Sequence, residues 1–227
     1  MYFDSTYILV LIGAVLSMIA SSNVQSTFRK YSGVYANSRM TAEDVALHIL
    51  HKAGIYDVRI ERVSGSLTDH YSPNEKVLRL SYSVYGSSSI AAIGVAAHEC
   101  GHAIQHQVHY APLKLRSLSV PLANIGSKLS WPLIILGLVL GFSGLASIGV
   151  WLFVFVVLFQ LITLPVEFNA SSRAMKILES DAILYRNELK GARSVLTAAA
   201  LTYVAALVSS MLQLLRLVLI TNNNRRR

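Results

Sequence analysis

The stretch LSWPLIILGLVLGFSGLASIGVWLFVFVVLFQLITLPV, residues 129–166, carries no charged side chain. As a single helix it would be about 57 Å long, at about 1.5 Å per residue, whereas the hydrocarbon core of a bilayer is only about 30 Å thick. The chain must therefore turn within this stretch, and residues 141–149 supply glycines and serines for a turn. We expect a transmembrane hairpin over 120–166, with helices at 120–141 and 146–166.

Two further uncharged runs lie toward the ends of the chain. Residues 5–28 contain no charge, and because a span needs roughly 20 apolar residues, this run predicts a first transmembrane helix. A cleaved signal peptide is the alternative, but Asp4 precedes the run and no small-x-small cleavage site follows it. Residues 194–215 are also uncharged, and we expect a fourth helix over 194–220, which either crosses the membrane or lies at its interface.

The overall composition indicates a membrane protein and narrows the class of partner. Hydrophobic residues make up 53% of the 227 residues and charged residues 14%, against about 25% charged in soluble domains. A net charge of +8 can indicate nucleic-acid binding, but here the lysines and arginines flank the uncharged runs and form no basic stripe with interleaved aromatics. We therefore expect the lipid bilayer, and no nucleic acid, as a partner. The single cysteine excludes an internal disulfide.

The stretch 30–118 is the only one that is long and polar enough to form a water-soluble domain. Within them, Thr41 and Asp44 are typical of a capping box at the start of an amphipathic helix. Alternating apolar and polar residues predict strands at 58–61 and 77–82, and the alanine-rich stretch that follows predicts one continuous helix. The expected fold is a mainly α membrane protein, with about four transmembrane helices and a small α+β domain.

That last helix contains the sequence HECGH, residues 98–102. Residues four apart share one face of a helix, so His98 and His102 can both bind one zinc ion. Glu99 follows the first ligand directly, and its carboxylate can serve as the general base that deprotonates a zinc-activated water. The alternative is a chance pentapeptide on a core helix. The small apolar residues before His98 and the helix that continues after His102 favour the metal site.

A catalytic zinc site needs a third protein ligand. The spacing HExxHxxGxxH is absent, because Val108 stands where the third histidine would be. His106 lies one turn beyond His102, but ligands on three consecutive turns are spread over about 12 Å and cannot converge on one ion. We interpret His106 as supporting a ligand, facing the substrate or lying at the domain surface.

Glu167 opens the juxtamembrane segment 167–193, directly after the expected hairpin. By that point the chain has crossed the membrane twice and returned to the side that carries His98 and His102. A carboxylate at the membrane boundary is costly unless it faces water or a partner, and a zinc ion would be such a partner. Glu167 is therefore the best candidate for the third ligand; the alternative is a charge that ends the span and faces water.

Other residues near the expected site are weaker candidates. His70 and Tyr71 lie in the expected turn before the second strand, where either could stabilise an oxyanion or serve only the hairpin. The strand 77–82 is a possible edge for an extended substrate. Cys100, two positions after His98, points about 200° round the helix from it, and we interpret it as a packing residue.

These features together resemble a known family. The segments LTDHY at 67–71, HECGHAIQH at 98–106 and EFNASSRA at 167–174 closely resemble the YugP-like bacterial family of membrane neutral zinc metallopeptidases. The order of motifs is also distantly similar to the membrane proteases of the HtpX and CaaX-protease type. The resemblance implies a zincin-like domain of the gluzincin type, with Glu167 as the third zinc ligand. Those relatives carry an aspartate where this chain has Ser171, which leaves that role to Ser171, Asn169 or another group.

The working hypothesis is an integral-membrane zinc endopeptidase of the bacterial cell membrane, acting on proteins or peptides at the bilayer. A membrane scaffold or chaperone-like protein that keeps zinc for folding alone is the alternative, and the intact base argues against it. If all four helices cross, most lysines and arginines lie on the catalytic side, and the positive-inside rule places that side in the cytoplasm. The tail Arg225–Arg227 would then lie outside, against the rule.

Overall fold

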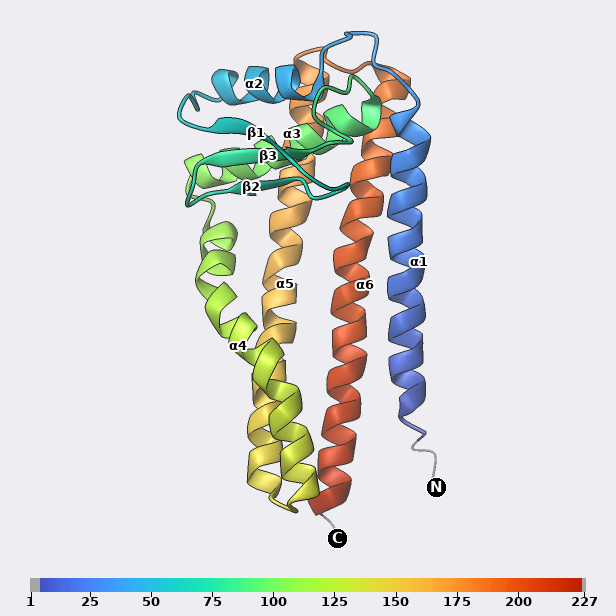
Figure 1. The fold of residues 1–227 in the computed structure, drawn as a ribbon, viewed down its shortest axis with the longest axis vertical. Coiled ribbons are helices and arrows are strands. Elements are labelled where there is room, and N and C mark those ends of the chain that lie inside the picture. Colours follow the sequence, from blue (N-terminus) through green and yellow to red (C-terminus); the bar gives the residue numbers. More distant parts are fainter. Residues whose placement is uncertain (1–4, 226–227) are drawn as a thin grey trace. The chain divides into compact units, whose positions relative to one another are not determined.

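The computed structural model describes residues 5–225, which are mostly helical (Figure 1). Arg226 and Arg227 of the basic tail lie outside the described residues. The elements in chain order are α1 Tyr7–Ser32, α2 Ala42–Lys52, β1 Arg59–Val63, β2 His70–Ser72, β3 Val77–Ser81, α3 Ile90–Gln107, α4 Ala111–Val139, α5 Ser143–Ser180 and α6 Arg186–Arg225.

Four of these helices, α1, α4, α5 and α6, are long and apolar enough to cross a membrane. This confirms the prediction of a mainly α membrane protein with four candidate spans and a small sheet. The helices extend beyond the uncharged runs that predicted them. In particular, α4 begins at Ala111 with Pro121 inside it, and α5 continues past Val166 to Ser180.

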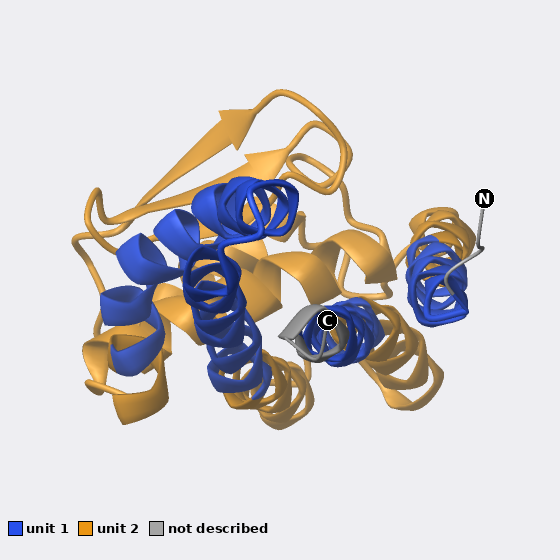
Figure 2. Ribbon diagram, turned by 90° about the horizontal axis from the view of Figure 1, so that it is seen from below, with its two compact units in different colours: residues 1–21, 115–164, 201–227 blue, residues 22–114, 165–200 orange. Residues whose placement is uncertain are grey.

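The chain divides into two compact units, coloured separately in Figure 2. Unit 1 consists of the chain up to Ser21, residues 115–164 and the chain from Leu201 onward. Its helices approach closely at small residues: a Cβ added to Gly149 would lie 2.7 Å from the carbonyl oxygen of Ser130 on α4. The hairpin turn is tighter than the predicted 141–149, because α5 already begins at Ser143.

Unit 2 consists of residues 22–114 and 165–200. The expected soluble domain therefore shares one compact unit with the segment that follows the hairpin. The predicted capping box is present, since the Thr41 side chain accepts the Asp44 N–H and the Asp44 side chain accepts the Thr41 N–H. The core is formed by apolar side chains from α1, α2, α3, α5 and α6 and from the sheet, among them Ile49, Leu78, Leu80, Ile93, Ala97, Leu178 and Leu196.

The sheet has the order β1-β3-β2, with β1 parallel and β2 antiparallel to β3. Two expectations were wrong here. His70 and Tyr71 do not lie in a turn but in strand β2, paired with Arg79 and Leu78. Strand β3, predicted as an edge, is the central strand, and its buried residues on both faces reflect that position. The edge strand that contacts α3 is β2.

Candidate metal centre

Helix α3 brings the two histidines onto one face. It starts at the N-cap Ser89, whose hydroxyl accepts the N–H of Ala92 at 3.2 Å. The run of alanine and small apolar residues that follows keeps the helix regular and lets it pack closely in the core. His98 and His102 lie one turn apart on this helix. The centroids of their imidazole rings are 4.8 Å apart, and the two ring planes are nearly perpendicular.

Glu167, from α5, completes a cluster with these histidines. Its Oε2 lies 3.3 Å from Nε2 of His98 and 3.5 Å from Nε2 of His102, and its side chain is only 3% exposed. The three candidate ligand atoms all lie within 4.8 Å of one another. The structure thus brings together two residues from α3 and one that lies 65 positions further along the chain.

A glycine allows α5 to come this close to α3. A Cβ built on Gly101 would lie 2.6 Å from the carbonyl oxygen of Ala170, a distance that real Cβ atoms do not show. Ala170 is one turn beyond Glu167 on α5, so this contact sets the distance at which the carboxylate meets the histidines. Gly101, an unspecified position of the HExxH pattern, is therefore part of the site's architecture.

The far nitrogen of each histidine is held by a polar side chain. The Oγ of Ser171 lies 3.1 Å from Nδ1 of His98, and the Oε1 of Gln105 lies 3.0 Å from Nδ1 of His102. When Nδ1 donates to such an oxygen, Nε2 is left with a lone pair for a metal ion. Ser171, one of the groups to which the resemblance left the role of the missing aspartate, contacts His98 directly.

Gln105 is a site residue that the sequence analysis missed. It is fully buried, and its amide nitrogen donates to the backbone oxygen of Val166 at 2.8 Å and to Oδ1 of Asn169 at 3.0 Å. It therefore links His102 to the segment of α5 that carries Glu167. Its position three residues after His102, on the same helical face, was the available signal.

The charge environment of His102 reflects this packing. Burial lowers the pKa of the imidazole, but the hydrogen bond to Glu167 and the nearby negative charges of Glu99 and Glu167 outweigh burial and raise it above its usual value. A proton and a cation thus compete for the same nitrogen. The carboxylate of Glu167 attracts either of them.

Glu99 is near the cluster but is not part of it. Its Oε2 accepts the backbone N–H of Tyr71 from strand β2 at 3.0 Å, and its side chain is almost buried. Among the described residues, no group donates a hydrogen bond to its Oε1. One carboxylate oxygen is thus anchored to the sheet, and the other can accept a proton.

Tyr71 and His106 lie together, and His70 lies apart from them. The Tyr71 hydroxyl is 2.9 Å from Nδ1 of His106, so this strand is tied to α3 by both its backbone and a side chain. His70 is exposed, with Nδ1 2.9 Å from the backbone oxygen of Thr68. Asp69, just before β2, accepts the N–H and the hydroxyl of Ser81, and burial raises its pKa.

Cys100 lies away from the cluster, as its helical position predicts. Its Sγ donates to the backbone oxygen of Ala46 on α2 at 3.6 Å, and the side chain is fully buried. Burial raises the pKa of the thiol far above its usual range, which disfavours the thiolate that binds metals or attacks carbonyls. It serves packing between α2 and α3.

The donor set fits a zinc ion. Zinc binds imidazole nitrogen and carboxylate oxygen at about 2.0–2.2 Å, and tetrahedral bonds of that length separate the ligand atoms by roughly 3.3–3.6 Å. The distances of 3.3 and 3.5 Å from Glu167 to the two histidines fall in that range. Two nitrogens and one oxygen are also a ligand set that a catalytic zinc ion takes, with a fourth position open.

Comparison with known proteins gives two matches. The model of a family described as "Putative neutral zinc metallopeptidase" matches residues 6–222. The chain is also 50% identical, over 210 residues, to "Putative membrane protease YugP" of Bacillus subtilis (strain 168), a match that covers 92% of this chain and 93% of that relative. No solved structure matches the chain. The family match thus covers all the elements that carry the cluster.

Proposed function

The chain belongs to this family of zinc metallopeptidases, and from that premise we propose that it is an integral-membrane, zinc-dependent endopeptidase. The observation that carries the proposal is the convergence of His98, His102 and Glu167, with Glu99 beside them and outside the ligand set. Three protein ligands and a separate carboxylate are the parts that a hydrolytic zinc site requires.

A zinc ion bound by these three residues would supply Lewis acidity, polarising a peptide carbonyl and lowering the pKa of a coordinated water to about 7. The chain's own residues then perform the proton transfers. Glu99, anchored through Oε2 by the Tyr71 N–H, takes the proton of the attacking water on Oε1. The same carboxylate returns that proton to the amine of the leaving fragment, which completes hydrolysis of the peptide bond.

The residues around Glu99 have supporting roles in this proposal. Tyr71 orients Glu99 through its backbone, and its hydroxyl, paired with His106, holds β2 against α3. That hydroxyl is also one of the groups that the sequence analysis offered for stabilising an oxyanion. His70, exposed on the edge strand β2, is placed to contact an extended substrate.

We expect the substrates to be proteins or peptides at the membrane. Glu167 lies on α5, a helix that also contains the most apolar candidate span of the chain. The zinc site is therefore built on a membrane helix, and a polypeptide must come close to the bilayer to reach it. We further propose that the enzyme is a multi-pass protein of the bacterial cell membrane, with its active site facing the cytoplasm, because most lysines and arginines would then lie on the cytoplasmic side.

The test compares native membranes that contain wild-type protein with membranes that contain Glu99→Gln. Terminal-peptide proteomics should find new protein ends with the wild type and none with Glu99→Gln, because losing a general base lowers the rate by about 10²- to 10⁴-fold. Glu61→Gln, a matched change in a surface ion pair on β1, should cleave like the wild type. If membranes with the two proteins instead showed the same protein ends, and Glu99→Gln replaced the wild type equally well in cells, the protein would be a zinc-containing scaffold.

A further inference from the structure

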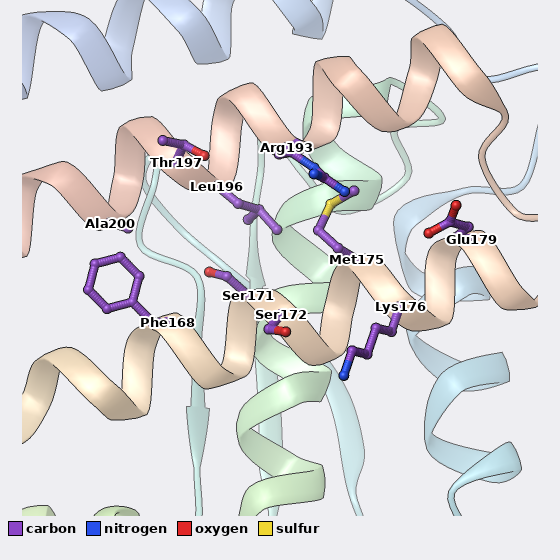
Figure 3. Close-up of a pocket in the computed structure, with 10 residues that line it drawn as sticks. All are labelled: Phe168, Ser171, Ser172, Met175, Lys176, Glu179, Arg193, Leu196, Thr197 and Ala200. Atoms are coloured by element: carbon purple, nitrogen blue, oxygen red, sulfur yellow. The ribbon is translucent and has the colours of Figure 1, made fainter.

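A groove lies between α5 and α6 inside unit 2, with a volume of about 470 Å³ (Figure 3). This size falls in the range of sites that take small ligands, about 300–1,000 Å³. Its buried floor is apolar and includes Met175, Leu196 and Ala200. The mechanism proposed above does not use this groove.

The groove changes from apolar to cationic along its length, and both helices agree on the direction. On α5, Phe168 lies next to the uncharged run that ends at Val166, and Lys176 lies two turns further from it. On α6, which returns antiparallel after a short loop, Ala200 lies within the uncharged run and Arg193 precedes it. On both helices, therefore, the apolar end of the groove is the end nearer to the membrane-spanning part.

The two cations of the groove are available to a ligand. Lys176 and Arg193 are exposed and make no hydrogen bond or ion pair with any residue that the structure describes. In Figure 3, the Arg193 side chain extends from α6 toward α5, and the Lys176 side chain extends from α5 on the side away from α6. Glu179 is the single carboxylate in the lining, so the lining carries a net positive charge. A phosphate group is the anion that such a pair of cations binds well.

We propose that this groove binds an anionic phospholipid. The phosphate binds to Arg193 at the cationic end, where the flexible Lys176 side chain turns toward it, and an acyl chain lies along Phe168, Leu196 and Ala200. A free phosphate would use only the cationic end and leave the apolar floor exposed to water. A lipid fills both ends of the groove, because its phosphate meets the cationic end and its acyl chain lies along the apolar end. Its acyl chain then points toward the membrane, as in a bilayer. The proposal rests on the groove alone and does not depend on peptidase activity.

The groove is adjacent to the metal cluster without including it. Ser171 belongs to the lining of the groove and contacts Nδ1 of His98, the ring atom opposite the Nε2 that faces Glu167. The lipid thus lies behind a candidate metal ligand and away from the atoms that would react. Binding of lipid and binding of zinc can therefore be measured separately on one sample.

The experiment measures phosphatidylglycerol retained by the purified full-length protein, by native mass spectrometry from detergent. The double variant Lys176→Gln/Arg193→Gln should bind roughly 10- to 30-fold more weakly, because each cation near a lipid phosphate contributes about a factor of five. Arg186→Gln/Lys190→Gln removes the same charge from α6 outside the groove and should bind like the wild type. Glu179→Gln should bind more tightly. Zinc content, measured in parallel, should equal wild type in all three variants and shows that they are folded.

Several results would overturn the assignment. Unchanged retention in the folded Lys176→Gln/Arg193→Gln protein would exclude the two cations as the phosphate site. Equal retention of phosphatidylcholine would exclude recognition of an anionic headgroup. Displacement of phosphatidylglycerol by millimolar inorganic phosphate would identify a free-anion site without a lipid chain. If the double variant lost zinc, the single variant Arg193→Gln would replace it, with a loss of about fivefold expected.

Discussion

At the scale of single residues, the cluster depends on groups that bind no metal themselves. Gln105 contacts His102 with one end of its amide and two groups of α5 with the other. Ser171, which lies on α5, contacts Nδ1 of His98 in the same way. Partners of this kind fix the ring orientation and tautomer of a metal-binding histidine, and losing one typically lowers metal affinity 10- to 100-fold.

Replacing Gln105 should therefore weaken metal binding without removing a ligand. We expect Gln105→Ala to lower zinc affinity by about 10- to 100-fold, because Nδ1 of His102 loses its partner and α5 loses its link to α3. Competition against a fluorescent zinc chelator in detergent measures this. Gln107→Ala, an exposed change at the end of the same helix, is the control. Equal affinities in the two variants would show that Gln105 has no part in the site.

At the scale of elements, the site exists where α3 and α5 cross. Gly101 permits the crossing because its missing Cβ leaves room for the carbonyl of Ala170. Gly94, on the same helix, faces Ala192 of α6 with more space, since its added Cβ would lie 3.4 Å from the nearest atom. Comparing alanine substitutions at these two glycines therefore separates the effect of the helix crossing from the general preference of helices for alanine.

We expect Gly101→Ala to displace α5 and lose bound zinc, with a destabilisation of about 1–3 kcal/mol, as is usual for overpacking. Gly94→Ala should keep its zinc and be neutral or stabilised by up to about 1 kcal/mol, because alanine favours the helix. Metal analysis and thermal unfolding in detergent measure both effects. A Gly101→Ala protein with full zinc content would show that the crossing distance is not set at this contact.

Asp181 directly follows the last residue of α5 and connects that end of the helix to α2. Its side chain is only 3% exposed and accepts hydrogen bonds from His48 and Lys52 of α2 and from Ser180. Burial alone would raise the pKa of Asp181, but these hydrogen bonds outweigh it, and the pKa lies below its usual value. The ionised carboxylate is thus bound more tightly in the folded protein than in the unfolded chain.

A lowered pKa in the folded state adds stability above the unfolded value, which is about 3.9 for aspartate, and loses it as the pH falls through the folded pKa. We therefore expect Asp181→Asn to be about 1–3 kcal/mol less stable than wild type at pH 7. The difference should shrink below about pH 4. Denaturant unfolding in detergent at several pH values measures it, with Asp57→Asn, in an exposed ion pair, as the control. A difference that does not change with pH would contradict the role of the charge.

At the scale of the whole molecule, the sequence predicted the helices better than the sheet. The four candidate spans follow from uncharged runs, a signal carried by neighbouring residues. Strand β2 has only three residues, too few for an alternating pattern, although it pairs with the next strand in the chain. The HExxH pattern identified three site residues because helical spacing is local. The contact of Gln105 with Val166 depends on the crossing of two distant helices, which no local pattern reveals.

The proposed orientation predicts which side of the membrane each part can be labelled from. In a Cys100→Ser background, Asn74→Cys, exposed before β3, should react with an impermeant maleimide only in inside-out vesicles. Phe142→Cys, exposed at the turn between α4 and α5, should react only in intact protoplasts. Labelling of both positions from the same side would contradict a hairpin that crosses the membrane twice, and the reverse pattern would place the active site outside.

The zinc content of the purified protein tests the central claim most directly. Elemental analysis of the wild type and of Glu99→Gln should find one zinc ion per chain, because Glu99 lies outside the ligand set. His98→Ala, His102→Ala and Glu167→Ala should each lose most of that zinc, since each removes one of the three proposed ligands. Zinc that stays stoichiometric in Glu167→Ala, or that is lost in Glu99→Gln, would contradict the assignment of ligands and base on which the proposed peptidase depends.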